Sequence, residues 1–165
     1  TMYFSFETLN DDARIWIFQS TNFLEFEKVE RISARLMNFL NDWQAHGKDL
    51  MASFTIIHDR FIVVALDEAS YQATGCSIDK LTHFIQALEK ELAISLLDRT
   101  QIAFRDENQL IEIIHMMDFR AALEAGEIDE HTVVFNNLIE NKGQLKRQWE
   151  TVLANSWHKQ WLPIA

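Results

Sequence analysis

The residues whose types are best suited to chemistry lie around the start of a helical pattern in the middle of the chain. Asp67 and Glu68 end a very apolar run, and Cys76 follows them at the start of that pattern. A thiol at the amino end of a helix meets partial positive charge, which favours the thiolate. Paired carboxylates can hold a hard cation or act as acid and base. Cys76, Asp67 and Glu68 are therefore the candidate catalytic residues of a small enzyme.

Each of these residues also has a structural interpretation, which the sequence favours. Free cysteines are among the most buried residues, so Cys76 is expected to fill space where a loop meets the helix. Neighbouring residues of a strand point to opposite sides, so Asp67 and Glu68 are not expected to converge on one metal ion. A catalytic thiol also needs a base, and none of the six histidines can be placed beside it from the sequence.

Four further polar residues are candidate ligand-binding positions: His46, Asn136, Asn137 and His158. His46 follows a helical pattern, where an imidazolium would cap the carboxyl end of the helix. Asn136 and Asn137 end an apolar strand, where their amides could bind a ligand or bond the backbone of a turn. The histidines show no H-E-x-x-H or H-x-x-x-H spacing, so no metal site is expected, and no cofactor motif is present.

Composition narrows the classes of partner. The formal net charge is -10, from 25 acidic and 15 basic residues, which opposes binding to nucleic acid. One cysteine cannot form an intramolecular disulfide, which favours a reducing compartment. No apolar run approaches the ~20 residues that span a bilayer, and residues 2–7 lack the features of a secretory signal. We expect a cytoplasmic protein without membrane insertion.

The elements that must position these residues alternate between strand and helix in the first part of the chain. Residues 14–19 are rich in β-branched and aromatic side chains and predict a strand. Apolar residues at three- and four-residue steps predict a helix over 22–43. Residues 52–57 and 61–66 predict a hairpin whose second strand is covered on both faces. A second long helix follows, with Ser77 as its candidate cap.

A possible closing strand at 101–104 would complete a ferredoxin-like βαββα(β) unit. We therefore predict an α+β fold with one sheet and helices packed on it, in a single domain over residues 1–165. The C-terminal region would add further strands and helices. These additions are a strand over 109–115, a short helix capped by Asp118 and ending near Gly126, a strand over 132–138 and a last helix over 144–153.

Four short segments carry a resemblance to a known family: residues 43–47 (Trp-Gln-Ala-His-Gly), 75–79 (Gly-Cys-Ser-Ile-Asp), 134–138 (Val-Phe-Asn-Asn-Leu) and 156–158 (Ser-Trp-His). Together they resemble a small family of bacterial proteins of about this length. The resemblance covers nearly the whole chain. Members of this family are often labelled "ABC transporter ATPase" and have no established activity.

The ATPase label can be tested on the residues alone. Such an ATPase needs the pattern G-x-x-x-x-G-K followed by Ser or Thr, because backbone amides wrap the phosphates and the hydroxyl binds magnesium. The chain has one Gly-Lys pair, Gly47-Lys48. Asp42 stands at the first glycine position and Asp49 replaces the hydroxyl. The sequence therefore contains no P-loop, and we do not expect a genuine ABC ATPase.

Two function classes remain. The favoured one is a non-enzymatic module that binds a partner protein or a small ligand, because no nucleophile, acid–base pair or cofactor motif stands out. The alternative is a small enzyme with its site at the start of the second long helix, around Cys76 and Asp67. Trp149, Trp157 and Trp161 make the C-terminal region aromatic, which predicts either packing on the core or association with a second copy of the chain.

Overall fold

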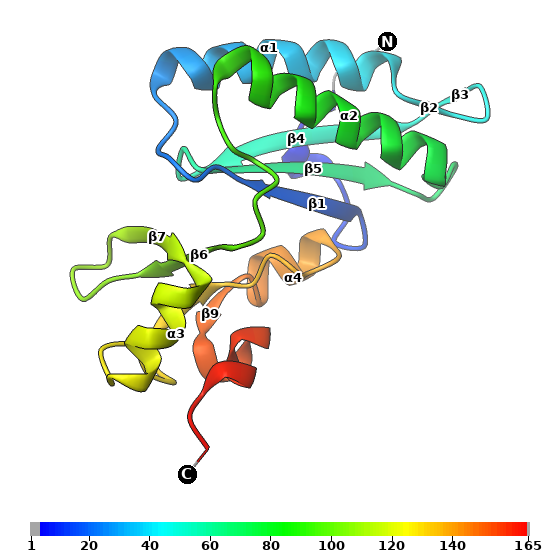
Figure 1. Cartoon of the computed structure of the whole chain (residues 1–165). Coiled ribbons are helices and arrows are strands. Elements are labelled where there is room, and N and C mark those ends of the chain that lie inside the picture. Colours follow the sequence, from blue (N-terminus) through cyan, green and yellow to red (C-terminus); the bar gives the residue numbers. More distant parts are fainter. Residues whose placement is uncertain (1–3, 165) are drawn as a thin grey trace. The chain divides into compact units, whose positions relative to one another are not determined.

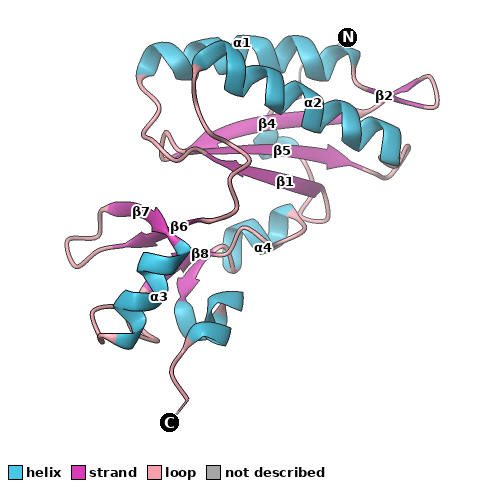
Figure 2. Ribbon diagram, in the orientation of Figure 1, coloured by secondary structure: helices cyan, strands magenta, loops and turns pink. Residues whose placement is uncertain are grey.

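The structure, a computed structural model, describes residues 4–164. Helices and antiparallel strands are both present throughout, so the predicted α+β class is confirmed (Figures 1 and 2). The chain divides into two compact units. Unit 1 comprises residues 1–97 with 140–143, and unit 2 comprises residues 98–139 with 144–165. The sequence prediction of a single domain stays a prediction. None of the described helices is long and apolar enough to cross a membrane.

Unit 1 contains a three-stranded antiparallel sheet. Its strands are β1 (Arg14–Gln19), β4 (Met51–Ile57) and β5 (Phe61–Asp67), in the order β1-β5-β4. The turn between β4 and β5 places His58 and Asp59 at φ 55° and 52°, in the left-handed region that tight hairpin turns use. These are the strands and the hairpin that the sequence predicted.

Two long helices, α1 (Phe26–Asp42) and α2 (Gly75–Leu92), pack on one face of this sheet (Figure 1). The apolar core between them includes Ile32, Leu36, Leu40, Phe54, Ile62, Val64, Leu66, Leu81, Ile85 and Leu88. The other alternate residues of β5 are also fully buried. The prediction that β5 is a central strand covered on both faces is therefore confirmed.

The order βαββα with strands β1-β5-β4 is that of a split βαβ unit, but the expected closing strand does not join the sheet. Strand β6 (Gln101–Arg105) belongs to a separate sheet of unit 2. The free side of β1 is instead met at its start by residues 140–141: Ile15 N donates to the Glu140 carbonyl at 3.0 Å. The strands thus form several antiparallel sheets, and the expectation of one sheet is wrong.

A buried lysine fixes the amino-terminal segment of unit 1. Lys142, only 2% exposed, is the first residue of α4 (Lys142–Arg147). Its Nζ donates to the carbonyl oxygens of Phe6, Glu7 and Leu9 at 2.9, 3.0 and 2.7 Å. An ammonium group has three N–H donors, so all of them are satisfied, as burial of a charge requires. The 3-10 helix η1 (Phe6–Thr8) is therefore anchored by this lysine.

Unit 2 contains a four-stranded antiparallel sheet in the order β7-β6-β8-β9. The strands beside β6 are β7 (Ile111–His115), β8 (Val133–Phe135) and β9 (Glu150–Val152). Helix α3 (Met116–Glu124) buries Phe119 and Leu123 against this sheet. Its cap is His115, whose Nδ1 accepts from Met117 N at 3.1 Å, and the predicted Asp118 cap is wrong.

Two further predictions for unit 2 are corrected. The strand expected over 132–138 is limited to β8, because the chain turns at Asn136 and Asn137. The helix expected over 144–153 ends at Arg147, and β9 follows it. The reason is tertiary: the Trp149 indole packs on Phe135 with ring centroids 5.0 Å apart, and pairing with β8 outweighs local helix propensity.

The aromatic C-terminal residues pack within unit 2. Trp149 is buried, and Trp157 and Trp161 lie against the apolar cluster that includes Phe119. The Trp157 and Trp161 rings meet edge-on at 4.9 Å in the 3-10 helix η3 (Trp157–Trp161), which follows η2 (Leu153–Asn155). The sequence left open whether these residues pack on the core or associate with a second copy of the chain. The contacts within unit 2 agree with packing on the core.

Candidate binding groove beside strand β4

The two candidate carboxylates are used by their own loop. Asp67 Oδ1 accepts from Ala69 N at 2.8 Å, and Glu68 Oε2 accepts from Ala73 N at 3.0 Å. Glu68 also lies 3.9 Å from the Arg14 guanidinium. Within residues 4–164, no group of three or more His, Cys, Asp or Glu side chains is arranged to hold a metal ion. The geometry therefore gives these carboxylates a structural role.

Cys76 is exposed in the first turn of α2, so the expectation of a buried, space-filling thiol is wrong. The cap of this helix is Thr74, and the predicted cap Ser77 completes a capping box with it. Ser77 N donates to Thr74 Oγ1 at 3.1 Å, and Thr74 N donates to Ser77 Oγ at 2.7 Å. The capping box satisfies the amides at the start of α2 and leaves the thiol outside the core.

His46 lies in a turn and does not cap α1. It joins β2 (Gln44–Ala45) to β3 (Lys48–Asp49), with φ 50° at His46 and φ 73° at Gly47. Two successive positive φ values are those of a tight hairpin turn, for which glycine is the usual second residue. The end of α1 is closed instead by Trp43 N, which donates to the Leu40 carbonyl at 3.4 Å.

The remaining candidate residues, Asn136, Asn137 and His158, have structural roles within unit 2. Asn137 Oδ1 accepts from Trp149 Nε1 at 2.9 Å, and Asn136 Oδ1 accepts from Leu138 N at 3.2 Å. His158 is 1% exposed, and its Nδ1 lies 2.7 Å from Ser156 Oγ. Burial lowers the pKa of His158 to about 4, because the charged imidazolium is excluded from an apolar environment. These contacts place His158 in the core of the unit.

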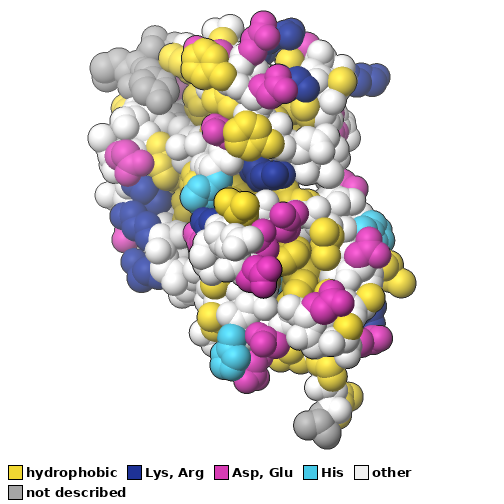
Figure 3. Space-filling view, turned by 90° about the vertical axis from the view of Figure 1, so that its left-hand side faces the viewer, with side chains coloured by type: hydrophobic (Ala, Val, Ile, Leu, Met, Phe, Trp, Pro, Cys, Tyr) yellow, Lys and Arg dark blue, Asp and Glu magenta, His cyan; other side chains and the backbone are white. Residues whose placement is uncertain are grey.

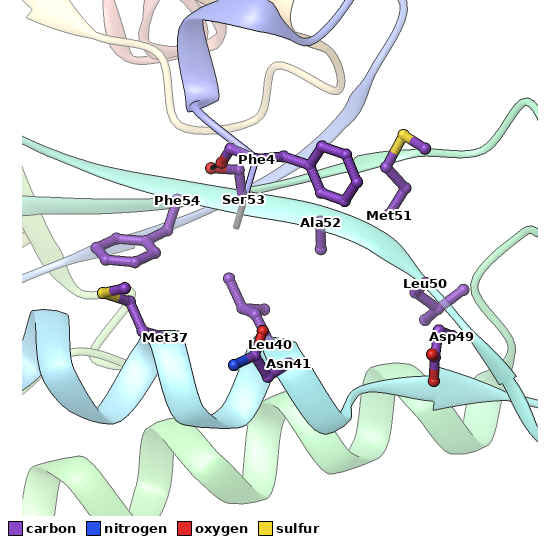
Figure 4. Close-up of a pocket in the computed structure, with 10 residues that line it drawn as sticks. All are labelled: Phe4, Met37, Leu40, Asn41, Asp49, Leu50, Met51, Ala52, Ser53 and Phe54. Atoms are coloured by element: carbon purple, nitrogen blue, oxygen red, sulfur yellow. Dashed lines mark hydrogen bonds between the residues drawn. The ribbon is translucent and has the colours of Figure 1, made fainter. Parts of the chain in front are cut away.

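A site that the sequence did not reveal lies beside β4. A cavity of about 240 Å³ opens between α1 and the first part of this strand (Figure 4). We call it the β4 groove. It is lined by Phe4, Met37, Leu40, Asn41, Asp49, Leu50, Met51, Ala52, Ser53 and Phe54. Figure 4 shows Phe4 and Met51 on one side of the β4 ribbon and Met37 and Leu40 on the other, so the cavity follows the edge of the strand.

The edge of β4 itself lacks the features that usually prevent strand pairing. Among the described strands, β4 is hydrogen-bonded to β5 only. It has seven residues, Met-Ala-Ser-Phe-Thr-Ile-Ile, with no charged side chain and no proline. Natural edge strands are commonly short or carry lysine, proline or a bulge, because an open row of N–H and C=O groups invites another strand. Within residues 4–164, the amino-terminal segment meets β4 through a side chain, since Ser53 Oγ donates to the Phe4 carbonyl at 2.5 Å, and no second strand pairs with the β4 backbone.

The side chains at the groove suit an adaptable apolar contact. Met37 is 43% exposed and Met51 is 39% exposed, although both are large apolar residues. Methionine is flexible and polarisable, and it is common on surfaces that bind varied apolar partners. Acidic and basic side chains both appear on the face drawn in Figure 3, with apolar side chains exposed between them. The β4 groove combines an open strand edge with such apolar surface.

Comparisons of the chain with protein-family models, with curated proteins and with solved structures find no match. The resemblance to the small bacterial family stays a prediction.

Proposed function

We propose that this protein is a non-enzymatic binding module that takes an extended segment of a partner protein on the free edge of β4. One observation supports the proposal: the edge strand β4 has no charged residue or proline to oppose pairing, and an apolar cavity lies beside it. A segment added as a strand would pair its backbone with β4, and its alternate side chains would enter the groove. The main chain would supply affinity and the groove would supply specificity.

The size of the groove favours a peptide over a small molecule. Ligand sites that enclose a drug-sized molecule have volumes of about 300–1,000 Å³. The β4 groove, at about 240 Å³, is smaller and suits one or two side chains. Burial of one Leu- or Phe-sized side chain contributes about 1.5–3 kcal/mol, so the backbone pairing is needed for stable binding.

We also propose that the protein acts in the cytoplasm, because its one thiol, Cys76, is free and exposed, as a reducing compartment permits. Neither ATP nor nucleic acid is part of the proposed activity. Association of two copies through their aromatic C-terminal regions is not required by it, since those tryptophans pack on the core of their own unit.

A library of random phage-displayed peptides, panned on the full chain, tests the proposal. Selected peptides should share alternating apolar residues and bind with reduced affinity to Met37→Glu and Met51→Glu. Met117→Glu is the matched control, because Met117 is an exposed methionine of unit 2 at 62% exposure. Circular dichroism would confirm that all three variants are folded.

Backbone pairing has its own test. N-methylation of alternate residues of a selected peptide should abolish binding in one register and preserve it in the other, because a strand added at an edge uses every second N–H group. If no peptide is enriched, or if both methionine variants bind like Met117→Glu, the proposed function is wrong.

A further inference from the structure

One side of α1 forms a continuous surface with the β4 groove. Phe26, Glu30, Ser33, Met37 and Asn41 follow each other at three- and four-residue steps, so they share one side of the helix. Met37 and Asn41 line the groove, and α1 runs over β4 (Figure 1). The shared side of α1 therefore lies along the edge strand.

Phe26 is a second apolar position on this side. It is 80% exposed, an unusual state for a phenylalanine. Met37 lies eleven positions after Phe26, which is about three turns and about 16 Å along the helix axis. An extended chain covers that distance in about five residues, at about 3.3 Å for each. Side chains on one side of a strand recur at every second residue, so two of them four residues apart, about 13 Å, can reach both Met37 and Phe26.

The charges of α1 are divided between its two sides. Arg31 and Arg35 lie on the side toward α2, where their guanidinium groups are 3.5 and 2.8 Å from the Glu91 carboxylate. The side that carries Phe26 and Met37 has no basic residue, and Glu30 lies between the two apolar positions. Asp49 adds a second carboxylate at the end of the groove. The surface along β4 is therefore apolar and acidic.

This charge pattern favours one class of binding partner for the β4 groove. A second copy of the chain would bring an equally acidic surface without a basic residue against this one, and the whole chain carries a net charge of -10. A basic segment would be attracted to Glu30 and Asp49. Electrostatic complementarity therefore favours a cationic partner over self-association.

We infer that the segment bound by the β4 groove is cationic, with a Lys or Arg midway between two apolar residues that are four residues apart. One apolar side chain occupies the cavity at Met37, the other packs on Phe26, and the basic residue lies near Glu30. This inference rests on the proposed function and specifies the chemical class of the partner segment.

Two series of synthetic peptides test the inference by fluorescence polarisation with the full chain. Both have two apolar residues four positions apart, and they differ in having Lys or Glu midway between them, where the side chain lies on the same side of the strand as the two apolar side chains. The Lys series should bind about fivefold tighter or more at low salt, since exchanging Glu for Lys replaces a repulsive charge pair with an attractive one. The difference should narrow as salt screens the charges.

Matched variants separate the two charged sides of the helix. Glu30→Lys should remove the preference for Lys peptides, whereas Glu27→Lys makes the same change in net charge at an exposed position outside the shared side and should keep it. Phe26→Ser should weaken binding of peptides that carry both apolar residues. Leu110→Ser, at an exposed leucine of unit 2, is its control and should leave binding unchanged.

The outcomes distinguish this inference from the proposed function. If peptides bind in a Met37-dependent manner but show no Lys preference, or if Glu30→Lys behaves as Glu27→Lys does, the inference is wrong and the binding module remains. If no peptide of either series binds, the proposed function fails as well. A concentration-dependent dimer in sedimentation that Met51→Glu abolishes would make a second copy the occupant and would overturn the cationic partner.

Discussion

The indole Nε1 of Trp43 donates a hydrogen bond to the Ser77 carbonyl oxygen at 2.8 Å, inside the core of unit 1. This bond connects the residue that ends α1 to the first turn of α2. Trp43 is also packed edge-on against Trp16 of β1, with ring centroids 5.8 Å apart. A single side chain thus joins both helices to the sheet of unit 1.

Trp43→Phe should lower the free energy of unfolding by about 1–3 kcal/mol, because the variant loses the buried hydrogen bond and leaves a small cavity. Urea denaturation followed by circular dichroism measures the change. Tyr71→Phe, at a residue that is 45% exposed, is the control and should have almost no effect. Equal stability of Trp43→Phe and the unchanged protein would show that the hydrogen bond adds nothing.

Lys142→Met should destabilise the protein by about 3 kcal/mol, although methionine has nearly the same length and is less costly to bury. The variant removes the three donors that bind the carbonyl oxygens of Phe6, Glu7 and Leu9, of which the Phe6 oxygen keeps the Leu9 N–H at 3.2 Å. Thermal and urea unfolding measure the loss, with exposed Lys80→Met as the control. An unchanged midpoint would mean that water replaces the ammonium group.

The parts of the fold that the sequence predicted are those whose signal is local. The strand over 14–19 and the two long helices are marked by the spacing of their own apolar residues, and the structure places them within a few residues of the predicted bounds. The C-terminal elements depend on distant partners. Helical spacing over 144–153 is real, but Trp149 and β9 are held by Phe135 and β8, which a local pattern does not reveal.

The β4 groove could not be predicted from the sequence, for a related reason. Met37 and Met51 fit ordinary helix and strand patterns, and their exposure becomes visible only when α1 and β4 are placed side by side. The expected closing strand failed in the same way, since its departure to the sheet of unit 2 depends on pairing partners far along the chain. By contrast, the chemical residues that drew attention, Asp67, Asn136 and Asn137, had structural uses that their turn positions already allowed.

The protein should not bind ATP in a magnesium-dependent manner. Gly47 and Lys48 lie in a tight turn and in β3, which pairs with β2, so this segment does not lead into a helix whose amides could surround phosphates. Equilibrium dialysis with radiolabelled ATP and Mg²⁺ should show no saturable binding, and Lys48→Ala should behave like the unchanged chain. Saturable binding that Lys48→Ala removes and Lys159→Ala keeps would restore the ATPase assignment.

Protonation of His158 should destabilise the protein in mild acid. Burial lowers the pKa of the folded-state imidazole from 6.5 to about 4. Below pH 6.5 the unfolded chain therefore binds a proton that the folded protein does not, and the free energy of unfolding falls as the pH decreases toward 4. The loss is about 1.4 kcal/mol for each pH unit, or about 3 kcal/mol over the interval.

Urea denaturation at several pH values between 7 and 4 measures this loss, and His158→Gln isolates the contribution of the imidazole. Glutamine can keep a hydrogen bond to Ser156 but does not titrate, so the variant should be less stable at neutral pH and should lose less stability on acidification. His131→Gln, at a histidine whose side chain is 81% exposed, should follow the pH dependence of the unchanged protein. If His158→Gln also follows it, groups other than His158 determine the sensitivity to acid.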